Sequence, residues 1–474
     1  MKSAFAAMVL VAWSGGAFAQ KYVFTELDQL PEVGAGFSGS IGSPRAINSK
    51  GQIAGSSYLN GVPISHAMIW NGTTPTDLGT LGGSSSTAQG INAKGQVVGS
   101  AETPDGHDHA TIWNGTTPTD LGTLGGTDSE AMAINDAGEV VANSFLPNGE
   151  LHSFVFNSTT PADYLDLGTL GGPYSVALGI NVAGQIVGYS ATGNNGPTVA
   201  VIWQASTATG IVNVTRLHTL GGIHGIGVAI SNSGKVAGEA QTVGGTYHAA
   251  LWSGLDPIDL GTLGTLTISD SSGINDEGQV VGRSFAPIGA ATAVIWQHGK
   301  IIDLNTLIAG PLAAHRTLNE ATAINNKGVI AGTGTDNLTG AAFMFVLTPV
   351  AEALAALRTE VKDVGPGRSL ANKVKLAEAY YLAHDTEATC AVLAGFTYEV
   401  KVLAHHRIDR TLAKQWVADA RAIEAAIGCR GRDCRLEKHD GHEKDDEGES
   451  ENSECHGHDA GVENDCECER VERR

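Results

Sequence analysis

The sequence predicts an all-β repeat body, a seven-bladed β-propeller closed by its N-terminal strand, followed by a small all-α bundle and a disordered acidic tail. A unit of about 45 residues recurs seven times, most clearly in the two identical strings TPTDLGTLGG that end at Gly83 and Gly126. A complete unit contains four short strand patterns, the content of one propeller blade. The seventh unit lacks its last strand, and a matching segment stands at the N-terminus.

The second unit illustrates the predicted strands. The segment from Ala88 to Asn92 alternates towards an isoleucine, and the Asn-Ala-Lys-Gly sequence that follows predicts a hairpin turn, because Asn bonds its own backbone and Gly accepts a positive φ. A Val-rich strand returns over residues 96–100. A third strand is predicted at His109–Trp113 and a fourth at Thr119–Leu124.

One aromatic residue ends the third strand pattern of every unit. A large ring at a fixed place in each repeat predicts the packing element between adjacent blades, because aromatic side chains bury the most area. These residues are Trp70, Trp113, Phe156, Trp203, Trp252, Trp296 and Phe345.

The N-terminal segment Tyr22–Leu30 resembles the fourth strands of the other units and brings their number to seven. Pairing of the two chain ends closes the ring and protects the sheet edges. The alternative is an open β-solenoid, which requires polar capping repeats at both ends. We find no such caps in the sequence.

The DLGTLGG strings, the INxxGQVVG segments and the His-Ala-x-x-Trp runs resemble the HAF family of probable extracellular repeats over about residues 40–345. The fourth, sixth and seventh units depart from the pattern, with Val199, Thr292 and Ala341 in place of the His. The resemblance implies bacterial export and repetition, and it implies no catalytic activity.

Residues 1–19 have the form of a signal peptide, with Lys2, an apolar run and an Ala-Phe-Ala cleavage site, so the mature chain is expected to begin at Gln20. A membrane helix is the competing interpretation, but the run is short and is broken by Gly15 and Gly16. No later stretch has the length and hydrophobicity of a transmembrane segment. We therefore expect a secreted protein, extracellular or periplasmic.

The formal net charge is −21, and residues 20–349 contain 10 Lys and Arg against 24 Asp and Glu. Nucleic-acid binding is unexpected, because phosphate contacts need clustered basic side chains. The partner is expected to be an extracellular protein or a glycan of unknown identity.

Four units place a His in the third strand and an Asp in the fourth, which suggests a hydrogen bond within each blade. These structural pairs are His66 with Asp77, His109 with Asp120, His152 with Asp166, and His248 with Asp259. A ring of His ligands for a metal is the alternative, and it would be incomplete because three units lack the residue.

No motif identifies a catalytic centre. The LGG segments lack the Gly-Lys-Ser/Thr ending of a phosphate loop, and no G-x-S-x-G elbow is present. The sequence therefore favours a non-catalytic extracellular interaction or scaffolding module. The alternative is a secreted hydrolase or lyase that uses the central face of the propeller, which would require acid and base groups around one deep pocket.

Residues 350–428 show helical periodicity, with helices expected at 369–383, 386–404 and 410–427 after a Gly-Pro-Gly break. Asp409 is a plausible N-cap, and Gly428 follows the last helix. The segment resembles the FIMAH domain, a helical module near the C-termini of exported proteins, in SLANKVKLAEA, FTYEV and ADARAIEAAI. This resemblance implies no site residues.

The tail from 429 to 474 is acidic and rich in Cys and His. Its charge and lack of apolar residues predict disorder. A divalent metal on the tail is a possible cofactor, with Cys455, His456, His458, Cys466 and Cys468 as candidate ligands, although a solvated or oxidised acidic tail is the simpler interpretation. The six cysteines fall in the last 85 residues and allow 15 full pairings.

Overall fold

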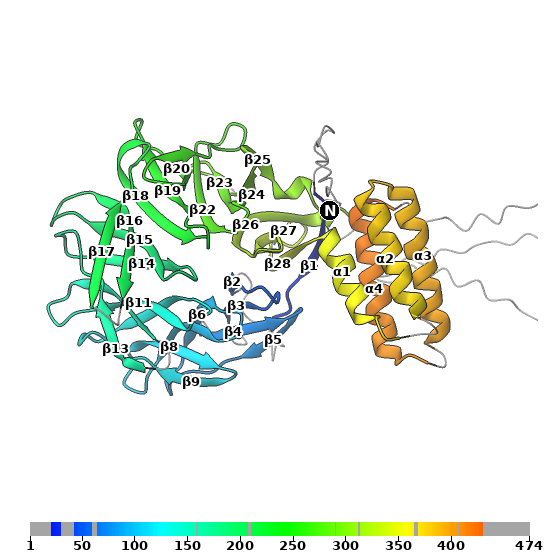
Figure 1. Ribbon diagram of the computed structural model, residues 1–474, viewed down its shortest axis with the longest axis horizontal. Helices are drawn as coiled ribbons and strands as arrows, with labels where there is room; N and C mark the ends of the chain where they lie inside the picture. Colours follow the sequence, from blue (N-terminus) through cyan, green and yellow to red (C-terminus); the bar gives the residue numbers. More distant parts are fainter. Residues whose placement is uncertain are drawn as a thin grey trace, which may run out of the picture. The chain divides into compact units, whose positions relative to one another are not determined.

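The computed structural model describes residues 20–29, 42–58, 64–157, 160–206, 210–289, 291–310, 313–364, 368–404 and 407–429. Within these residues the chain forms the predicted seven-bladed β-propeller followed by four helices (Figure 1). These described residues belong to one compact unit. No helix in the described ranges has the length and apolar character needed to cross a bilayer.

Each blade is a four-stranded antiparallel sheet, numbered here in chain order. Blade 1 comprises β2 (Ser43–Ile47), β3 (Ile53–Tyr58), β4 (Ser65–Asn71) and β5 (Thr74–Asp77). Blade 2 comprises β6 (Ser86–Ile91), β7 (Val97–Glu102), β8 (Asp108–Asn114) and β9 (Thr117–Asp120). Blade 3 comprises β10 (Ser129–Ile134), β11 (Glu139–Phe145), β12 (Leu151–Asn157) and β13 (Thr160–Asp166).

Blade 4 comprises β14 (Ser175–Ile180), β15 (Gln185–Ala191), β16 (Thr198–Ser206) and β17 (Ile211–Arg216). Blade 5 comprises β18 (Gly221–Ile230), β19 (Val236–Thr242), β20 (Tyr247–Trp252) and β21 (Pro257–Asp259). Blade 6 comprises β22 (Ile268–Ile274), β23 (Val280–Phe285), β24 (Thr292–Gln297) and β25 (Lys300–Asp303). Two 3₁₀ turns, Leu304–Thr306 and Ala313–His315, precede blade 7.

Blade 7 closes the ring as predicted. It consists of β26 (Arg316–Ile324), β27 (Ile330–Asp336), β28 (Ala342–Pro349) and, as its outer strand, β1 (Tyr22–Glu26) from the N-terminus. The two ends pair antiparallel, with Tyr22 opposite Pro349 and Glu26 opposite Phe345. β28 is the third strand of blade 7. Because β1 pairs along it, β28 has no unpaired edge.

The aromatic residues pack between blades as expected. Trp113 of blade 2, for example, lies in one buried cluster with Ala54 and Ala67 of blade 1. Blade 7 departs from the predicted pattern of aromatic residues. In blade 1 the aromatic Trp70 lies opposite Ile53 of the second strand, whereas in blade 7 the equivalent Ile330 lies opposite Leu347 and not opposite Phe345. Phe345 is still buried in the core between blades 6 and 7.

The fourth strands end earlier than predicted: β5, β9, β13, β21 and β25 end at the Asp that begins the DLGTL-type motif, and β17 ends at Arg216, which takes its place. In blade 2 the chain leaves the sheet after Asp120, because Gly122 adopts a φ of 73° and its N–H donates to that carboxylate. The N-terminal strand likewise ends at Glu26. The leucines that follow the motif Asp, such as Leu78 and Leu121, pack into the hydrophobic clusters between neighbouring blades.

A ring of hydrogen bonds explains the repeated Ile-Asn-x-x-Gly motif. The Asn92 side chain accepts from the backbone N–H groups of Lys94 and Gln96, which forms the predicted turn. It also donates to the backbone oxygen of Asn135 in the next blade at 3.2 Å. Equivalent links join all neighbours except blades 5 and 6, and their donors are Asn48, Asn92, Asn135, Asn181, Asn275 and Asn325.

The link from blade 5 is missing because Ser231 stands where the other blades have Asn. Its hydroxyl bonds Ser233 and accepts from the backbone N–H of Lys235, and it does not reach the next blade. The neighbouring Asn232 donates to Asp276 through its backbone N–H, as Ala93 does to Asp136 between blades 2 and 3, and in addition through its side chain. The six Asn links, together with these bonds between blades 5 and 6, connect all seven turns.

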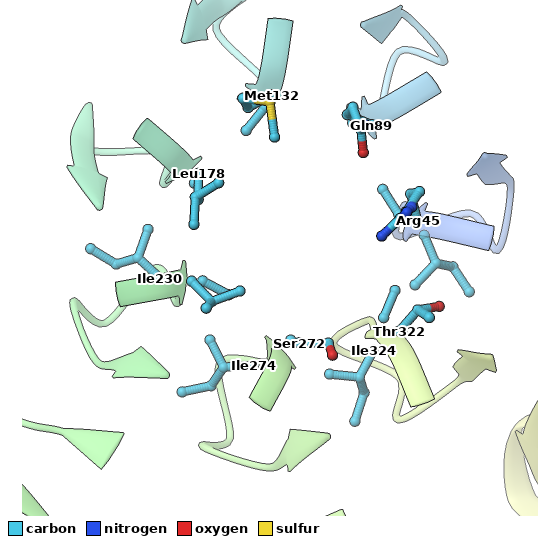
Figure 2. A pocket seen from close by; sticks show the side chains of 18 of the residues that line it. Arg45, Gln89, Met132, Leu178, Ile230, Ser272, Ile274, Thr322 and Ile324 are labelled. Atoms are coloured by element: carbon cyan, nitrogen blue, oxygen red, sulfur yellow. The ribbon is translucent and has the colours of Figure 1, made fainter. Parts of the chain in front are cut away.

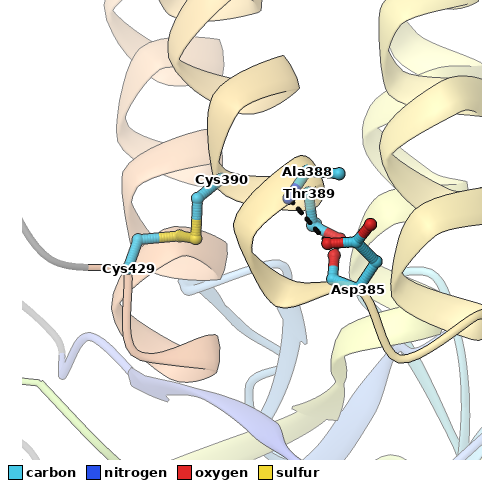
Figure 3. Close-up of a disulfide and its surroundings, with 5 residues drawn as sticks. All are labelled: Asp385, Ala388, Thr389, Cys390 and Cys429. Atoms are coloured by element: carbon cyan, nitrogen blue, oxygen red, sulfur yellow. Dashed lines mark hydrogen bonds between the residues drawn. A yellow bond between two sulfur atoms is a disulfide. The ribbon is translucent and has the colours of Figure 1, made fainter.

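The helices are α1 (Val350–Glu360), α2 (Ser369–Leu382), α3 (Thr386–Leu403) and α4 (Arg410–Ile427), which agree with the predicted helices to within one residue where helices were predicted. Asp385 caps α3 by accepting from the N–H of Ala388, and Asp409 caps α4. A disulfide joins Cys390 of α3 to Cys429 just beyond α4, with Cα atoms 5.6 Å apart (Figure 3). Val23 of β1 belongs to the hydrophobic core of the helices. The closing strand therefore pairs with β28 in the propeller and also packs against the helical bundle.

Candidate binding site in the central channel

The first strands of all seven blades surround a cavity of about 430 Å³. Each contributes the isoleucine that precedes the turn Asn or Ser, so one layer of the wall is a complete isoleucine ring. Its members are Ile47, Ile91, Ile134, Ile180, Ile230, Ile274 and Ile324. The repeated isoleucine of the motif is therefore a channel-lining residue.

A second layer of the wall is built from β-bulges. The pairing between the first and second strands of every blade shifts by one residue at the same place, as between Pro44 and Ala46. The extra residue in each strand lines the cavity, and we call these seven residues the bulge ring (Figure 2). They are Arg45, Gln89, Met132, Leu178, Val228, Ser272 and Thr322.

The bulge ring has two chemically different halves. Blades 6, 7, 1 and 2 contribute Ser272, Thr322, Arg45 and Gln89, which form a continuous polar arc. Blades 3, 4 and 5 contribute Met132, Leu178 and Val228, which form a continuous apolar arc on the other side. A ligand that fills this layer meets hydrogen-bonding groups on one side and hydrocarbon on the other.

Among the described residues, two charged side chains line the cavity, those of Arg45 and Glu320. Glu320 accepts from the Arg283 guanidinium at 3.4 Å. Within the described part of the chain Arg45 makes no ion pair or hydrogen bond, and its side chain is exposed to the channel. Its charge lowers the pKa of the nearby Glu130, although burial raises that pKa more strongly.

An acidic cluster lies behind the wall, between blades 5, 6 and 7. Arg283 bonds Asp270 at 3.0 Å as well as Glu320. Burial, reinforced by the negative charge of Asp270, raises the pKa of Glu239 to about 7. Of these four residues only Glu320 lines the cavity.

The structure brings each sequence-predicted His to its Asp. The distances from His Nδ1 to the nearer carboxylate oxygen are 2.9 Å for His66, 2.9 Å for His109, 2.8 Å for His152 and 3.0 Å for His248. The partners are Asp77, Asp120, Asp166 and Asp259.

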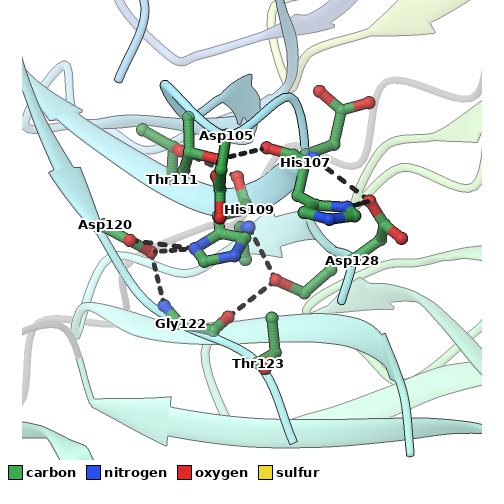
Figure 4. Close-up of polar contacts among 12 residues, drawn as sticks. Asp105, His107, His109, Thr111, Asp120, Gly122, Thr123 and Asp128 are labelled. Carbon is green, nitrogen blue, oxygen red and sulfur yellow. Dashed lines mark hydrogen bonds and ion pairs between the residues drawn. The ribbon is translucent and has the colours of Figure 1, made fainter. Parts of the chain in front are cut away.

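The same carboxylates also organise the turns that follow the fourth strands. Asp120 accepts from the N–H of Gly122 while it bonds His109 (Figure 4). Nearby, the Ser129 hydroxyl donates to Gly122 O and accepts from Ala110 N, which ties blade 3 to blade 2. These histidines lie on third strands, away from the residues that line the cavity.

No group of three or more His, Cys, Asp or Glu side chains is placed to hold a metal within the described ranges. The predicted tail ligands Cys455, His456, His458, Cys466 and Cys468 lie outside those ranges. The bulge ring is the feature of the candidate site that the sequence analysis did not predict. The signal was present, because each member stands three residues before the turn Asn or Ser and differs from unit to unit.

No family model matches the chain, and no curated protein matches it. Among solved structures it is similar to the β-propeller domain of the Trilobed protease from Pyrococcus furiosus, with a TM-score of 0.46, 10% identity, and coverage of 66% of this chain and 94% of that one. It is also similar to the Pyrococcus horikoshii acylaminoacyl peptidase (TM-score 0.42, 10% identity, 70% and 55% coverage). A third similar structure is the BP39L lectin from Burkholderia pseudomallei (TM-score 0.36, 13% identity, 65% and 98% coverage).

Proposed function

We propose that this protein is an exported, non-catalytic interaction module that holds a partner, an extracellular protein or a glycan, at the central channel of its propeller. The observation that carries the proposal is the bulge ring. Seven structurally equivalent positions carry seven different residues and line the same cavity.

The isoleucine ring provides an internal comparison for this argument. It lines the same cavity two residues further along each strand, and all seven blades keep the same residue there. A position that serves only packing or closure is expected to repeat in the same way, because its surroundings repeat. Variation confined to the neighbouring layer instead gives the channel a defined chemical pattern, which is what selective recognition requires.

The charges at the channel favour binding over hydrolysis or lyase chemistry. General acid–base catalysis needs titratable groups within hydrogen-bonding distance of the substrate. Glu320 is the one carboxylate among the described residues that line the cavity, and it is engaged by Arg283. Glu239 has a suitably raised pKa, but it is not among the residues that line the cavity.

Export is proposed on two grounds, the signal-peptide pattern of residues 1–19 and the disulfide between Cys390 and Cys429. Disulfides persist in oxidising compartments and are rare in the cytosol. The resemblances to HAF repeats and the FIMAH domain support the same proposal. All of these features fit a protein that works outside the cytoplasm.

The test uses the mature chain from Gln20 on an array of bacterial and host glycans and extracellular proteins. We expect binding to at least one class, lost in Leu178→Ser and retained in Ile288→Ser, a control whose side chain is 93% exposed on a loop. Equal melting temperatures of the two variants would exclude a folding effect. Binding that Leu178→Ser leaves unchanged, or turnover of an arrayed ligand, would contradict the proposal.

A further inference from the structure

We propose that the channel binds an aliphatic monocarboxylate, with the carboxylate at Arg45 on the polar arc and the hydrocarbon chain against Met132, Leu178 and Val228 on the apolar arc. This inference rests on the proposed function, because it assigns a ligand class to the same channel. It is carried by the charges and the arrangement of the bulge ring.

The charges at the channel wall favour the binding of an anionic group. Among the described residues Arg45 is the one cation that lines the cavity, and it makes no hydrogen bond or ion pair there, although its charge acts on the buried Glu130. The carboxylate of Glu320 is engaged by Arg283 at 3.4 Å, and that of Glu130 accepts from the Gln89 amide at 2.7 Å. The N–H groups of Arg45 therefore remain available to a ligand, and a guanidinium pairs best with a planar carboxylate through two parallel hydrogen bonds.

The apolar arc favours a ligand that also carries a hydrocarbon chain. Met132, Leu178 and Val228 follow one another around the ring, and the isoleucine ring continues this apolar surface along the channel. A methionine beside branched residues adapts to chains of different shape. A sugar or an inorganic anion would leave this surface unfilled, and an uncharged hydrocarbon would leave Arg45 unpaired.

The cavity is of a suitable size and is accessible. Its volume of about 430 Å³ lies in the range of small-molecule sites. The net negative charge of the chain does not prevent an anion from approaching, because charges more than about 8 Å away are screened at physiological ionic strength. The ligand must meet Arg45 at close range, where the desolvated pair is screened least.

The experiment compares three ligands that share one tail and differ in the head group. Octanoate, 1-octanol and octylammonium are titrated calorimetrically into the mature protein. We expect octanoate to bind most tightly and octylammonium not to bind. Hexanoate should bind more weakly than octanoate by up to about fifteenfold, because two methylenes leave the apolar arc.

Variants separate the two halves of the site. Arg45→Gln should weaken octanoate by about ten- to a hundredfold and leave octanol unchanged, since only the charge-assisted bonds are lost. Met132→Ser should weaken both ligands. Lys50→Gln, which removes an exposed cation from the turn of the same blade, is the matched control and should change neither. Thermal melts verify that each variant is folded.

Octylammonium binding as tightly as octanoate, or an affinity for octanoate that Arg45→Gln leaves unchanged, would overturn the inference. Failure of octanoate to bind would also overturn it. In that case the proposed function stands if array binding still depends on Leu178, and it falls together with the inference if no binding depends on the bulge ring.

Discussion

Exchange of Asn and Ser within the ring of turns should change stability in opposite directions at two blades. Asn92→Ser places in blade 2 the residue that blade 5 already has, and Ser231→Asn does the reverse. Asn92 is 2% exposed, so its bonds are sheltered from water. The pair of substitutions tests whether the blades are held together by the side-chain ring as well as by their apolar interfaces.

The structure sets the size of the effect. Asn92 makes four hydrogen bonds through its side chain: to Gln96 Oε1, to Asn135 O, and from the backbone N–H groups of Lys94 and Gln96. Ser231 shows that a serine keeps one backbone acceptor bond, at 3.1 Å from Lys235 N. Three bonds are lost at about 1 kcal/mol each, so Asn92→Ser should cost about 2–4 kcal/mol.

The gain from Ser231→Asn is smaller, about 1 kcal/mol. It adds a bond to the backbone of Asn275, but residue 235 is a Lys and cannot accept the second N–H as Gln96 does. The existing bonds between Asn232 and Asp276 already join these two blades, which further limits the gain.

Urea unfolding followed by tryptophan fluorescence measures both changes, with Lys94→Ala as an exposed control in the same turn. The reasoning would be refuted if Asn92→Ser fell within about 0.5 kcal/mol of this control. A loss of stability in Ser231→Asn would show that the turn of blade 5 has its own requirement for Ser.

Four further predictions follow. A chain that begins at about Gly39 lacks β1 and leaves β28 with an open edge, so it should melt at a lower temperature and aggregate, as light scattering will show. Replacing both Cys390 and Cys429 by Ser should cost about 4 kcal/mol in chain-entropy terms for a separation of 39 residues, measured by denaturant unfolding. His109→Ala should cost about 1–2 kcal/mol, because the side chain is only 23% exposed, with no metal released in elemental analysis. Glu239→Gln should raise stability by up to about 3 kcal/mol at pH 8 and leave it unchanged at pH 4.

The sign of the last prediction follows from the raised pKa of Glu239, which is about 7 in the folded chain against 4.5 for an ordinary glutamate. Its contribution to stability is fully present below pH 4.5 and is lost as the pH rises through 7, because the buried carboxyl must then ionise beside Asp270. A variant that differs from the parent equally at both pH values would contradict this assignment.

Each of the other three predictions has its own contrary result. An unchanged melting temperature after truncation would mean that β1 does not close the ring. Equal stability with and without the cysteines would mean that the bundle does not depend on the bridge. Zinc or copper that is bound by the parent protein and lost in His109→Ala would support the alternative interpretation, in which the histidines form a ring of metal ligands.

The repeat pattern predicted the fold because its strongest signals are local. Alternation and the Asn-x-x-Gly turn each act within a few residues, and one aromatic per unit marks the interface with the neighbouring blade. The missing fourth strand at the end of the seventh unit indicated the closing pair. Two details depended on tertiary contacts. The fourth strands end at residues such as Asp120 because the following glycine turns, and Leu347 replaces Phe345 in register because the pairing starts from Ile330.

The site was harder to predict than the fold for a physical reason. A repeat is recognised by the residues that its units share, whereas the bulge ring is made of residues that differ from unit to unit. Arg45 and Leu178 look unrelated until a one-residue shift in each strand places both in the channel. The His and Asp residues that did repeat lie on the third and fourth strands and bond one another there.

A crystal structure of the mature protein grown with octanoate tests the central claim most directly. We predict the ligand in the channel, with its carboxylate within hydrogen-bonding distance of Arg45 and its chain against Met132 and Leu178. Octanoate bound only on the outer faces of the blades, or seated in the channel with its carboxylate on the apolar arc, would contradict the account.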